Sequence, residues 1–294
     1  MKTKVTFKCF GTKIVGNLFT PPSYKEGDKL PAIVLVGPAT SVKEQVTGTY
    51  AEKLAEKGFV TLAFDHRTYG ESDGEPRATE DIFTKSEDVR SAVSFVRTLD
   101  QVDKDKVGAT AICAGASVLV VTAAGERRIK AMATISGALS LKGVIELSGG
   151  DTLLAAAGEA RQHFDETGEV VYMPAFTEET ADANQFNREA YDYYVGNQDK
   201  YPTWRNQIDS SFFANMATFD IPRIAALLAP TPVLFIAGTD AMTGPLSQNA
   251  YDHAQEPKEL YWVDGATHIS MYHKEEHVNQ AVEKLDGFFK EKLN

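Results

Sequence analysis

Short apolar runs alternate with helical spacing of apolar residues along most of the chain. Polar and apolar positions alternate on both sides of Gly11, which predicts a hairpin of two strands, residues 2–9 and 12–19. Continuous apolar runs predict strands buried on both faces of a sheet: residues 30–37, 59–65, 106–112, 131–135, 232–237 and 259–263. Spacing typical of helices falls between and after them, at residues 49–57, 86–99, 114–124 and 277–293. This alternation indicates the α/β class, with a mainly parallel central sheet flanked by helices.

The alternation stops between about residues 141 and 230, where helical patterns occur without a convincing buried strand. This stretch is also rich in aromatic residues, among them Tyr193, Tyr194 and Trp204. We therefore predict a core formed by residues 1–140 and 231–294, with a helical cap, 141–230, inserted over the carboxyl edge of the sheet. The three aromatic residues are candidate substrate contacts, and they are equally candidates for the cap's own core. A second helical layer with no substrate role is the alternative to a cap.

Charge narrows the possible partners. The net charge of −11 disfavours binding to nucleic-acid phosphates or to anionic lipid.

No apolar run approaches the ~18 residues that a membrane-spanning helix requires. The amino-terminal residues lack the apolar segment of a signal peptide, so we expect a cytoplasmic protein whose two cysteines, Cys9 and Cys113, form no structural disulfide. The chain also lacks zinc-type Cys/His spacing, and neither a metal nor another cofactor is predicted.

A candidate nucleophile stands between a predicted strand and a predicted helix. Residues 111–115 read A-I-C-A-G, with Cys113 at the centre. The order strand, turn, helix matches the nucleophile elbow G-x-S-x-G, with Cys in place of Ser and Ala111 in place of the first Gly. Small neighbours suit a strained turn, and a helix amino terminus favours thiolate. The alternative is that Cys113 is a small buried apolar residue, as free cysteines usually are.

The other triad members follow in the order nucleophile, acid, histidine. His268 stands in a Gly-containing loop after the last predicted strand, a placement that the other five histidines lack. An exposed loop histidine is the alternative. Asp240 follows the strand at 232–237 and is our candidate for the acid that orients the ring. Asp264 and Asp65 are its rivals, although we expect Asp264 to be a turn residue and Asp65 to pair with Arg67 or cap its loop.

An oxyanion hole requires two backbone amides directed at the developing charge. Ala114, directly after the candidate nucleophile, supplies one amide. The loop after the first buried strand supplies the other, where Pro38 has no N–H and Ala39 is our choice, followed by Thr40.

Several segments together resemble the α/β-hydrolase superfamily and, more narrowly, its dienelactone-hydrolase-like branch. The segments are residues 38–45 (PATSVKEQ), 64–77 (FDHRTYGESDGEPR), 112–115 (ICAG), 191–194 (YDYY) and 265–268 (GATH). The resemblance implies a Cys-His-Asp triad of Cys113, His268 and Asp240, an ester, lactone or thioester substrate, and no cofactor. The broader group also contains acyl and polyketide transferases. Its oxyanion loop usually begins His-Pro-Gly or His-Gly, where this chain has Gly37-Pro38-Ala39.

These observations predict a hydrolase that forms a covalent acyl-enzyme on Cys113 with a small-molecule acyl substrate. An acyltransferase with the same triad is the first alternative. A non-catalytic ligand-binding protein on the same fold is the second alternative, and a homodimer is compatible with the sequence.

Overall fold

The computed structural model describes residues 1–140, 150–211 and 220–293. An eight-stranded sheet forms its centre, in the order β1-β2-β4-β3-β5-β6-β9-β10. The strands are β1 (Lys2–Cys9), β2 (Thr12–Phe19), β3 (Leu30–Val36), β4 (Val60–Phe64), β5 (Val102–Ile112), β6 (Ala131–Ile135), β9 (Val233–Gly238) and β10 (Lys258–Val263). β1 and β2 pair antiparallel and β2 joins β4 antiparallel, whereas β4, β3, β5, β6, β9 and β10 all run parallel. The predicted α/β-hydrolase architecture, a mainly parallel sheet flanked by helices, is confirmed.

Alternate side chains along the strands pack into two separate apolar clusters. On β3, Ala32, Val34 and Val36 join one apolar cluster, whereas Ile33 and Leu35 join the other. The first cluster includes buried residues of α2 (Ile82–Val96), α3 (Ala114–Gly125), α9 (Ile221–Ala225) and α10 (Gly244–His253). The second includes those of α1 (Val46–Glu56), α11 (Ser270–His273) and α12 (Glu275–Lys292). Both faces of the sheet are therefore covered, as continuous apolar strands require.

A capping residue, rather than the spacing of apolar residues, determines where α2 begins. α2 begins four residues before the predicted start at 86, because the Asp81 side chain accepts a 2.7 Å hydrogen bond from the Thr84 amide. A side-chain oxygen at this position satisfies an amide that has no partner within the helix. β5 also begins earlier than predicted, at Val102, where it pairs with Leu30 before a register shift.

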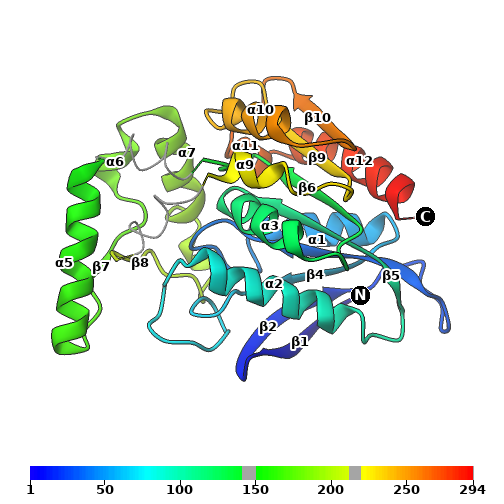
Figure 1. Cartoon of the computed structure of the whole chain (residues 1–294), viewed down its shortest axis with the longest axis horizontal. Coiled ribbons are helices and arrows are strands. Elements are labelled where there is room, and N and C mark those ends of the chain that lie inside the picture. The colour runs from blue at the N-terminus through cyan, green and yellow to red at the C-terminus, as the bar shows by residue number, and fades with distance from the viewer. Residues whose placement is uncertain (141–149, 212–219, 294) are drawn as a thin grey trace.

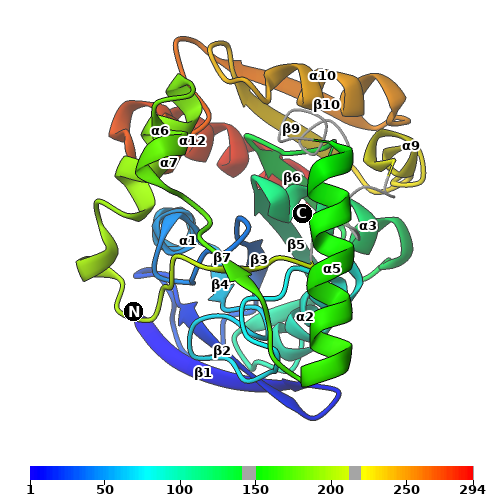
Figure 2. The same ribbon diagram turned by 90° about the vertical axis from the view of Figure 1, so that its left-hand side faces the viewer.

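The segment predicted as a cap is largely helical in its described parts. It holds α5 (Asp151–Thr167), α6 (Glu178–Ala181), α7 (Gln185–Tyr194), the 3₁₀ turn η1 (Gln198–Lys200) and a two-stranded ribbon, β7 (Tyr172–Met173) with β8 (Ile208–Asp209). Figure 1 shows α5 and this ribbon apart from the central sheet, and Figure 2 shows α5 and α7 on opposite sides of its central strands. Residues 141–149 and 212–219 of the predicted cap lie outside the described residues.

The last helix of the predicted cap range belongs with the core. α9 contacts α3 and α10, and its Ile221 and Ala225 are fully buried in the same apolar cluster as β5. The boundary predicted at residue 230 therefore falls after an element that packs as core. None of the helices in the described ranges is long and apolar enough to cross a bilayer.

Candidate active site

The junction between β5 and α3 has the backbone of a nucleophile elbow. Cys113 ends the strand and begins the helix with φ 57° and ψ −125°, a conformation that is strained for any residue with a Cβ. Gly115 lets this turn approach the neighbouring strand, because a Cβ there would lie 2.4 Å from the Gly37 carbonyl oxygen. Ala111, in place of the first glycine of the motif, is fully buried in β5. Strain at an otherwise ordinary residue is typical of functional turns.

Two backbone amides act on the Cys113 sulfur. Cys113, Ala114 and Ala39 are all partly exposed, whereas Ile112 and Gly115 beside them are buried. Burial raises the pKa of the Cys113 thiol, and hydrogen bonds from the Tyr272 hydroxyl and from the amides of Ala114 and Ala39 act to lower it. Both amides expected to form an oxyanion hole are therefore found at the sulfur. The amide of Thr40, the second choice, instead donates to Glu80 Oε1 at 2.8 Å.

His268 is buried, with 2% of its surface exposed, in the loop between β10 and α11. Its Nδ1 lies 2.7 Å from Thr243 Oγ1, and its Nε2 lies 3.0 Å from the Tyr272 hydroxyl. Burial lowers the pKa of His268 to about 3. The resting site therefore holds a neutral imidazole beside a thiol, and the thiolate–imidazolium pair that a Cys-His site can form is not its resting state.

Tyr272 stands between the two reactive side chains. The Tyr272 hydroxyl lies 3.0 Å from His268 Nε2, and the same side chain hydrogen-bonds to Cys113. The Tyr50 hydroxyl donates to the Met271 carbonyl at 2.9 Å, which anchors α11 and so places Tyr272. Sequence reasoning missed Tyr272, which lies before the last predicted helix, 277–293, although its position four residues after His268 was an available signal.

The structure does not place Asp240 on the histidine. Asp240 is exposed, and within the described residues its carboxylate is 3.4 Å from Thr239 Oγ1 and makes no hydrogen bond with His268. The turn after β9 directs the next residue, Ala241, inward and leaves Asp240 outside, so Thr243 occupies the position expected for the acid. Asp240 and His268 do line one small cavity of about 220 Å³.

Neither rival acid reaches His268. Asp264 is exposed near Thr239. Asp65 is fully buried and forms a 2.7 Å ion pair with Lys43, while it also accepts from the Glu71 amide. Of the two expectations for Asp65, the pairing with Arg67 is wrong, because Asp65 pairs with Lys43 of the oxyanion loop instead. The capping of its own loop is confirmed by the hydrogen bond from the Glu71 amide.

The three aromatic candidates for substrate contacts lie in a packed cluster behind the site. Tyr193, Tyr194 and Trp204 expose 7%, 2% and 0% of their surfaces. Tyr194 stacks on Trp204 at 5.6 Å, and Tyr193 meets Tyr272 edge-on at 5.3 Å between ring centroids. Neither the cavity of about 220 Å³ nor a second cavity of about 380 Å³ includes them in its lining. Their packing supports α11 and Tyr272.

The cap also covers the histidine. Phe186 of α7 meets the His268 ring edge-on, with centroids 5.1 Å apart. Glu189, one turn later on α7, accepts a 2.6 Å hydrogen bond from Thr267 Oγ1 in the histidine loop. Residues far apart in the chain therefore fix the imidazole between the cap and the core.

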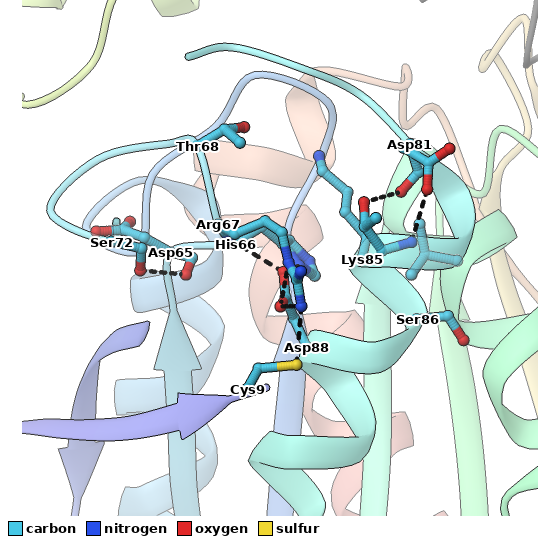
Figure 3. Close-up of polar contacts among 12 residues, drawn as sticks. Cys9, Asp65, His66, Arg67, Thr68, Ser72, Asp81, Lys85, Ser86 and Asp88 are labelled. Atoms are coloured by element: carbon cyan, nitrogen blue, oxygen red, sulfur yellow. Dashed lines mark hydrogen bonds and ion pairs between the residues drawn. The ribbon is translucent and has the colours of Figure 1, made fainter. Parts of the chain in front are cut away.

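A second group of polar residues surrounds the other cysteine. Figure 3 shows Arg67 between Cys9 of β1 and Asp88 of α2. Its guanidinium donates to Cys9 Sγ at 2.8 Å and to Asp88 Oδ1 at 2.8 Å, and His66 Nδ1 lies 3.3 Å from Asp88 Oδ2. We call Cys9, His66, Arg67 and Asp88 the Cys9 cluster. The described residues contain no group of three or more His, Cys, Asp or Glu side chains arranged to hold a metal ion.

The parallel sheet, the strained elbow at Cys113 and the buried histidine after the last strand define an enzyme of the α/β-hydrolase class. More narrowly, the chain belongs to the X-Pro dipeptidyl-peptidase (S15) family, whose model matches residues 11–270.

Individual relatives cover nearly the whole chain. The uncharacterized protein YcjY of Escherichia coli (strain K12) is 35% identical over 94% of this chain and 93% of its own length. The uncharacterized protein PA2218 of Pseudomonas aeruginosa is 33% identical over 99% of this chain and 80% of its own. Its crystal structure has a TM-score of 0.91 at 31% identity and covers 99% of this chain and 94% of that chain. The polyketide transferase grgF of a Penicillium species is 24% identical over 88% of this chain and 86% of its own.

Proposed function

We propose that this enzyme transfers the acyl group of an ester, lactone or thioester to Cys113 and then to water. The observation that carries the proposal is the convergence of the Ala114 and Ala39 amides on the sulfur of Cys113, a partly exposed residue at a strained elbow. Amides fixed in this way stabilise the negative oxygen of a tetrahedral intermediate without having to reorganise. We place the acyl chemistry with that of dienelactone-hydrolase-like enzymes on the strength of the same elbow.

Tyr272 carries the proton in the first step. The Tyr272 hydroxyl, which donates to the sulfur in the resting site, first turns its proton toward His268 Nε2, 3.0 Å away. The Tyr272 oxygen then accepts the thiol proton of Cys113 while its own proton moves to His268 Nε2. Neutral His268 is ready to accept it, and the negative charge that develops at the sulfur raises the pKa of the imidazole during the transfer. The sulfur attacks the carbonyl carbon, and the oxygen takes up the electron pair between the two amides. The carbon–leaving-group bond then breaks, and His268 returns its proton to the leaving group.

Water completes the cycle. His268 removes a proton from the water molecule that attacks the thioester, and the thiol is restored as the acid leaves. Thr243 holds the imidazole through Nδ1 in the role that the carboxylate of a triad plays. Our proposal for the site is therefore Cys113, Tyr272, His268 and Thr243, with Ala114 and Ala39 as the oxyanion donors, in place of a triad completed by Asp240.

Transfer of the acyl group to an alcohol or amine is a second candidate. Phe186 covers the His268 ring, which restricts the approach of water to the base. One relative of this chain is named a polyketide transferase, which supports the same candidate. Product analysis with added alcohol acceptors separates the two, because a transferase yields the new ester in excess over the free acid.

The deciding experiment is intact-mass spectrometry after incubation with p-nitrophenyl acetate. Wild-type protein is compared with Cys113→Ala and His268→Ala, and Cys9→Ala is the matched control. We expect an acetyl adduct or rapid turnover in wild type and Cys9→Ala, and neither in the other two variants. An adduct that persists in Cys113→Ala would identify a different nucleophile. An X-Pro p-nitroanilide assayed in parallel tests the peptidase activity for which the family is named.

A further inference from the structure

A cavity of about 380 Å³ begins beside the oxyanion loop. Thr40 lines it, and Thr40 directly follows Ala39, whose amide hydrogen-bonds to the Cys113 sulfur. The remaining wall comes from the loop after β4, which includes Thr68 and Arg77, and from the cap segment that contains Arg205 and Gln207. Three segments distant in sequence therefore line this cavity, and one of them also carries Ala39.

Among the described residues that line this cavity, only the two arginines are charged. Arg77 donates to the carbonyl oxygens of Ser72, Gly70 and Gly74, and Arg205 donates to those of Pro202 and Trp204. Within the ranges that the structure describes, neither guanidinium pairs with a carboxylate. A guanidinium has five N–H donors, so two remain on Arg77 and three on Arg205.

The carboxylates behind the cavity wall are already engaged. Glu80 forms a 2.5 Å ion pair with Lys85 and accepts from the Thr40 amide. Asp209 accepts from the amide and hydroxyl of Ser211, at 2.9 and 2.8 Å. In a chain with 41 acidic and 30 basic residues, these two arginines line one cavity without a carboxylate partner among the described residues, so their charge is available to an external anion.

A buried hydroxyl in the same wall also lacks a partner. Thr40 is 3% exposed, and its Oγ1 has no hydrogen-bond partner among the described residues. Its backbone is held in the left-handed region at φ 60°, which Thr seldom adopts and which fixes the direction of the side chain. A buried hydroxyl without a partner is costly unless a ligand supplies one.

The loop that carries Arg77 is held rigidly. Asp65 pairs with Lys43 and accepts from the Glu71 amide, and its carbonyl oxygen accepts from Ser72 Oγ, a contact drawn in Figure 3. On the other side, Arg67 joins the loop to Asp88 of α2. Because the loop is fixed at both sides, the Arg77 guanidinium is positioned before a ligand arrives, which lowers the entropy lost on binding.

We propose that this cavity binds an anionic oxygen group of the acyl substrate, through Arg77, Arg205 and the Thr40 hydroxyl. The proposal rests on the proposed function, since it assigns part of the same substrate. The group is either a carboxylate at the far end of the acyl chain or a phosphate on the arm of a thioester carrier. Both present the planar or tetrahedral oxygens that guanidinium binds in bidentate fashion.

The test compares anionic substrates with neutral counterparts. The p-nitrophenyl monoesters of adipic and suberic acid are assayed beside the mixed diesters in which the free carboxyl group is methylated. Butyryl-coenzyme A is assayed beside butyryl-N-acetylcysteamine. We expect wild type to prefer the anionic member of one pair. Arg77→Gln and Arg205→Gln should each reduce that preference by about tenfold. A preference among the p-nitrophenyl esters identifies a carboxylate, and a preference among the thioesters identifies a phosphate.

The ratio of anionic to neutral kcat/KM serves as an internal control, because a folding defect lowers both rates together. Arg77→Lys, which keeps the charge, should retain more of the ratio than Arg77→Gln. Arg161→Gln removes an exposed arginine of α5 that pairs with Asp165, and it should leave the ratio unchanged. Equal rates for both members of every pair, or a ratio that survives both glutamine variants, would overturn the proposal.

A binding measurement separates this proposal from the proposed function. Calorimetric titration of Cys113→Ala with p-nitrophenyl hydrogen adipate and with butyryl-coenzyme A, each beside its neutral counterpart, requires no turnover. Tighter binding of an anionic compound that is lost in the double variant Arg77→Gln, Arg205→Gln supports the cavity even if wild type hydrolyses neither ester. Turnover that depends on Cys113, combined with no preference for an anion in either assay, would support the proposed acyl chemistry and overturn the anion-binding role of the cavity.

Discussion

The chain contains two groups that combine a cysteine, a histidine and a polar side chain between them. At the Cys113 site, a tyrosine hydroxyl stands between thiol and imidazole, and a threonine holds the far side of the ring. In the Cys9 cluster, a guanidinium contacts the sulfur and a carboxylate holds the ring. By composition, the Cys9 cluster is closer to a Cys-His-Asp triad.

The two groups differ in the exposure of the cysteine and in the backbone amides directed at its sulfur. Cys9 is completely buried, and burial raises the pKa of its thiol. Cys113 is partly exposed at a strained turn with two amides directed at its sulfur. Burial by itself would raise the pKa of Asp88, but hydrogen bonds and charge from His66 and Arg67 hold it below its usual value. In the Cys9 cluster the charged groups pair with one another, although His66 Nε2 has no hydrogen-bond partner among the described residues. The Cys113 site instead keeps two backbone amides for a substrate.

The sharpest test of this comparison is to remove each sulfur. Cys113→Ala should lower kcat/KM for p-nitrophenyl acetate by about 10³-fold or more, because the nucleophile is lost. Cys9→Ala should leave turnover close to wild type and lower the free energy of unfolding by about 1 kcal/mol, since a buried contact is lost. Steady-state rates and urea unfolding of both variants provide the measurement. Comparable activity losses in the two would mean that both clusters serve catalysis.

The next test concerns the side chain between sulfur and imidazole. Tyr272→Phe should lower kcat by about 10²-fold, because the proton relay to His268 is broken while the ring packing on Tyr193 remains. Tyr251→Phe, on α10 away from the site, is the matched control. Full activity of Tyr272→Phe would mean that His268 reaches Cys113 directly.

Arg67→Met makes the corresponding change in the Cys9 cluster. It should destabilise the fold by about 3 kcal/mol, because Asp88 loses its cationic partner, and it should spare the activity of folded protein.

A third test uses the two buried imidazoles. Burial lowers the pKa of His268 to about 3 and also lowers that of His66. Each ring therefore takes up a proton more readily in the unfolded chain than in the folded one, so stability falls as the pH drops below about 6.5, the pKa of an unfolded histidine. His268→Gln should reduce this slope by about 1.4 kcal/mol per pH unit between pH 6 and 4. His66→Gln should reduce it in the same direction, and urea unfolding at several pH values measures both. A slope unchanged in either variant would contradict neutral burial of that ring.

The smallest expected effects distinguish the residues around the imidazole. Thr243→Val should lower kcat/KM by about tenfold, because the hydrogen bond that orients His268 is lost. Asp240→Asn should remain close to wild type, since its carboxylate is exposed and makes no described contact with the ring. The reverse order of the two effects would restore Asp240 as the acid. Asp88→Asn, the counterpart in the Cys9 cluster, should lower stability and leave kcat/KM unchanged.

The sequence by itself determined the sheet, the elbow and the place of the histidine. Continuous apolar runs such as residues 131–135 can bury both faces only inside a parallel sheet, and β6 has those bounds. The small residues around Cys113 predict a tight turn, because larger side chains would crowd it. The carboxyl ends of parallel strands meet at one edge of the sheet, which brings His268 to the same edge. Both of the favoured oxyanion donors, Ala114 and Ala39, could be proposed for the same reason.

Only the tertiary structure decided which side chains meet at that edge. A shift of one position in the turn after β9 sends Ala241 inward and Asp240 outward, and residue spacing cannot resolve such a shift. Tyr272 lies on α11, a short helix that the sequence pattern did not predict. The cavity of Thr40, Arg77 and Arg205 joins segments up to 165 positions apart, counted from their residue numbers in the chain. Local patterns carry the propensity of a segment, whereas the contacts between distant segments depend on the packing of the whole chain.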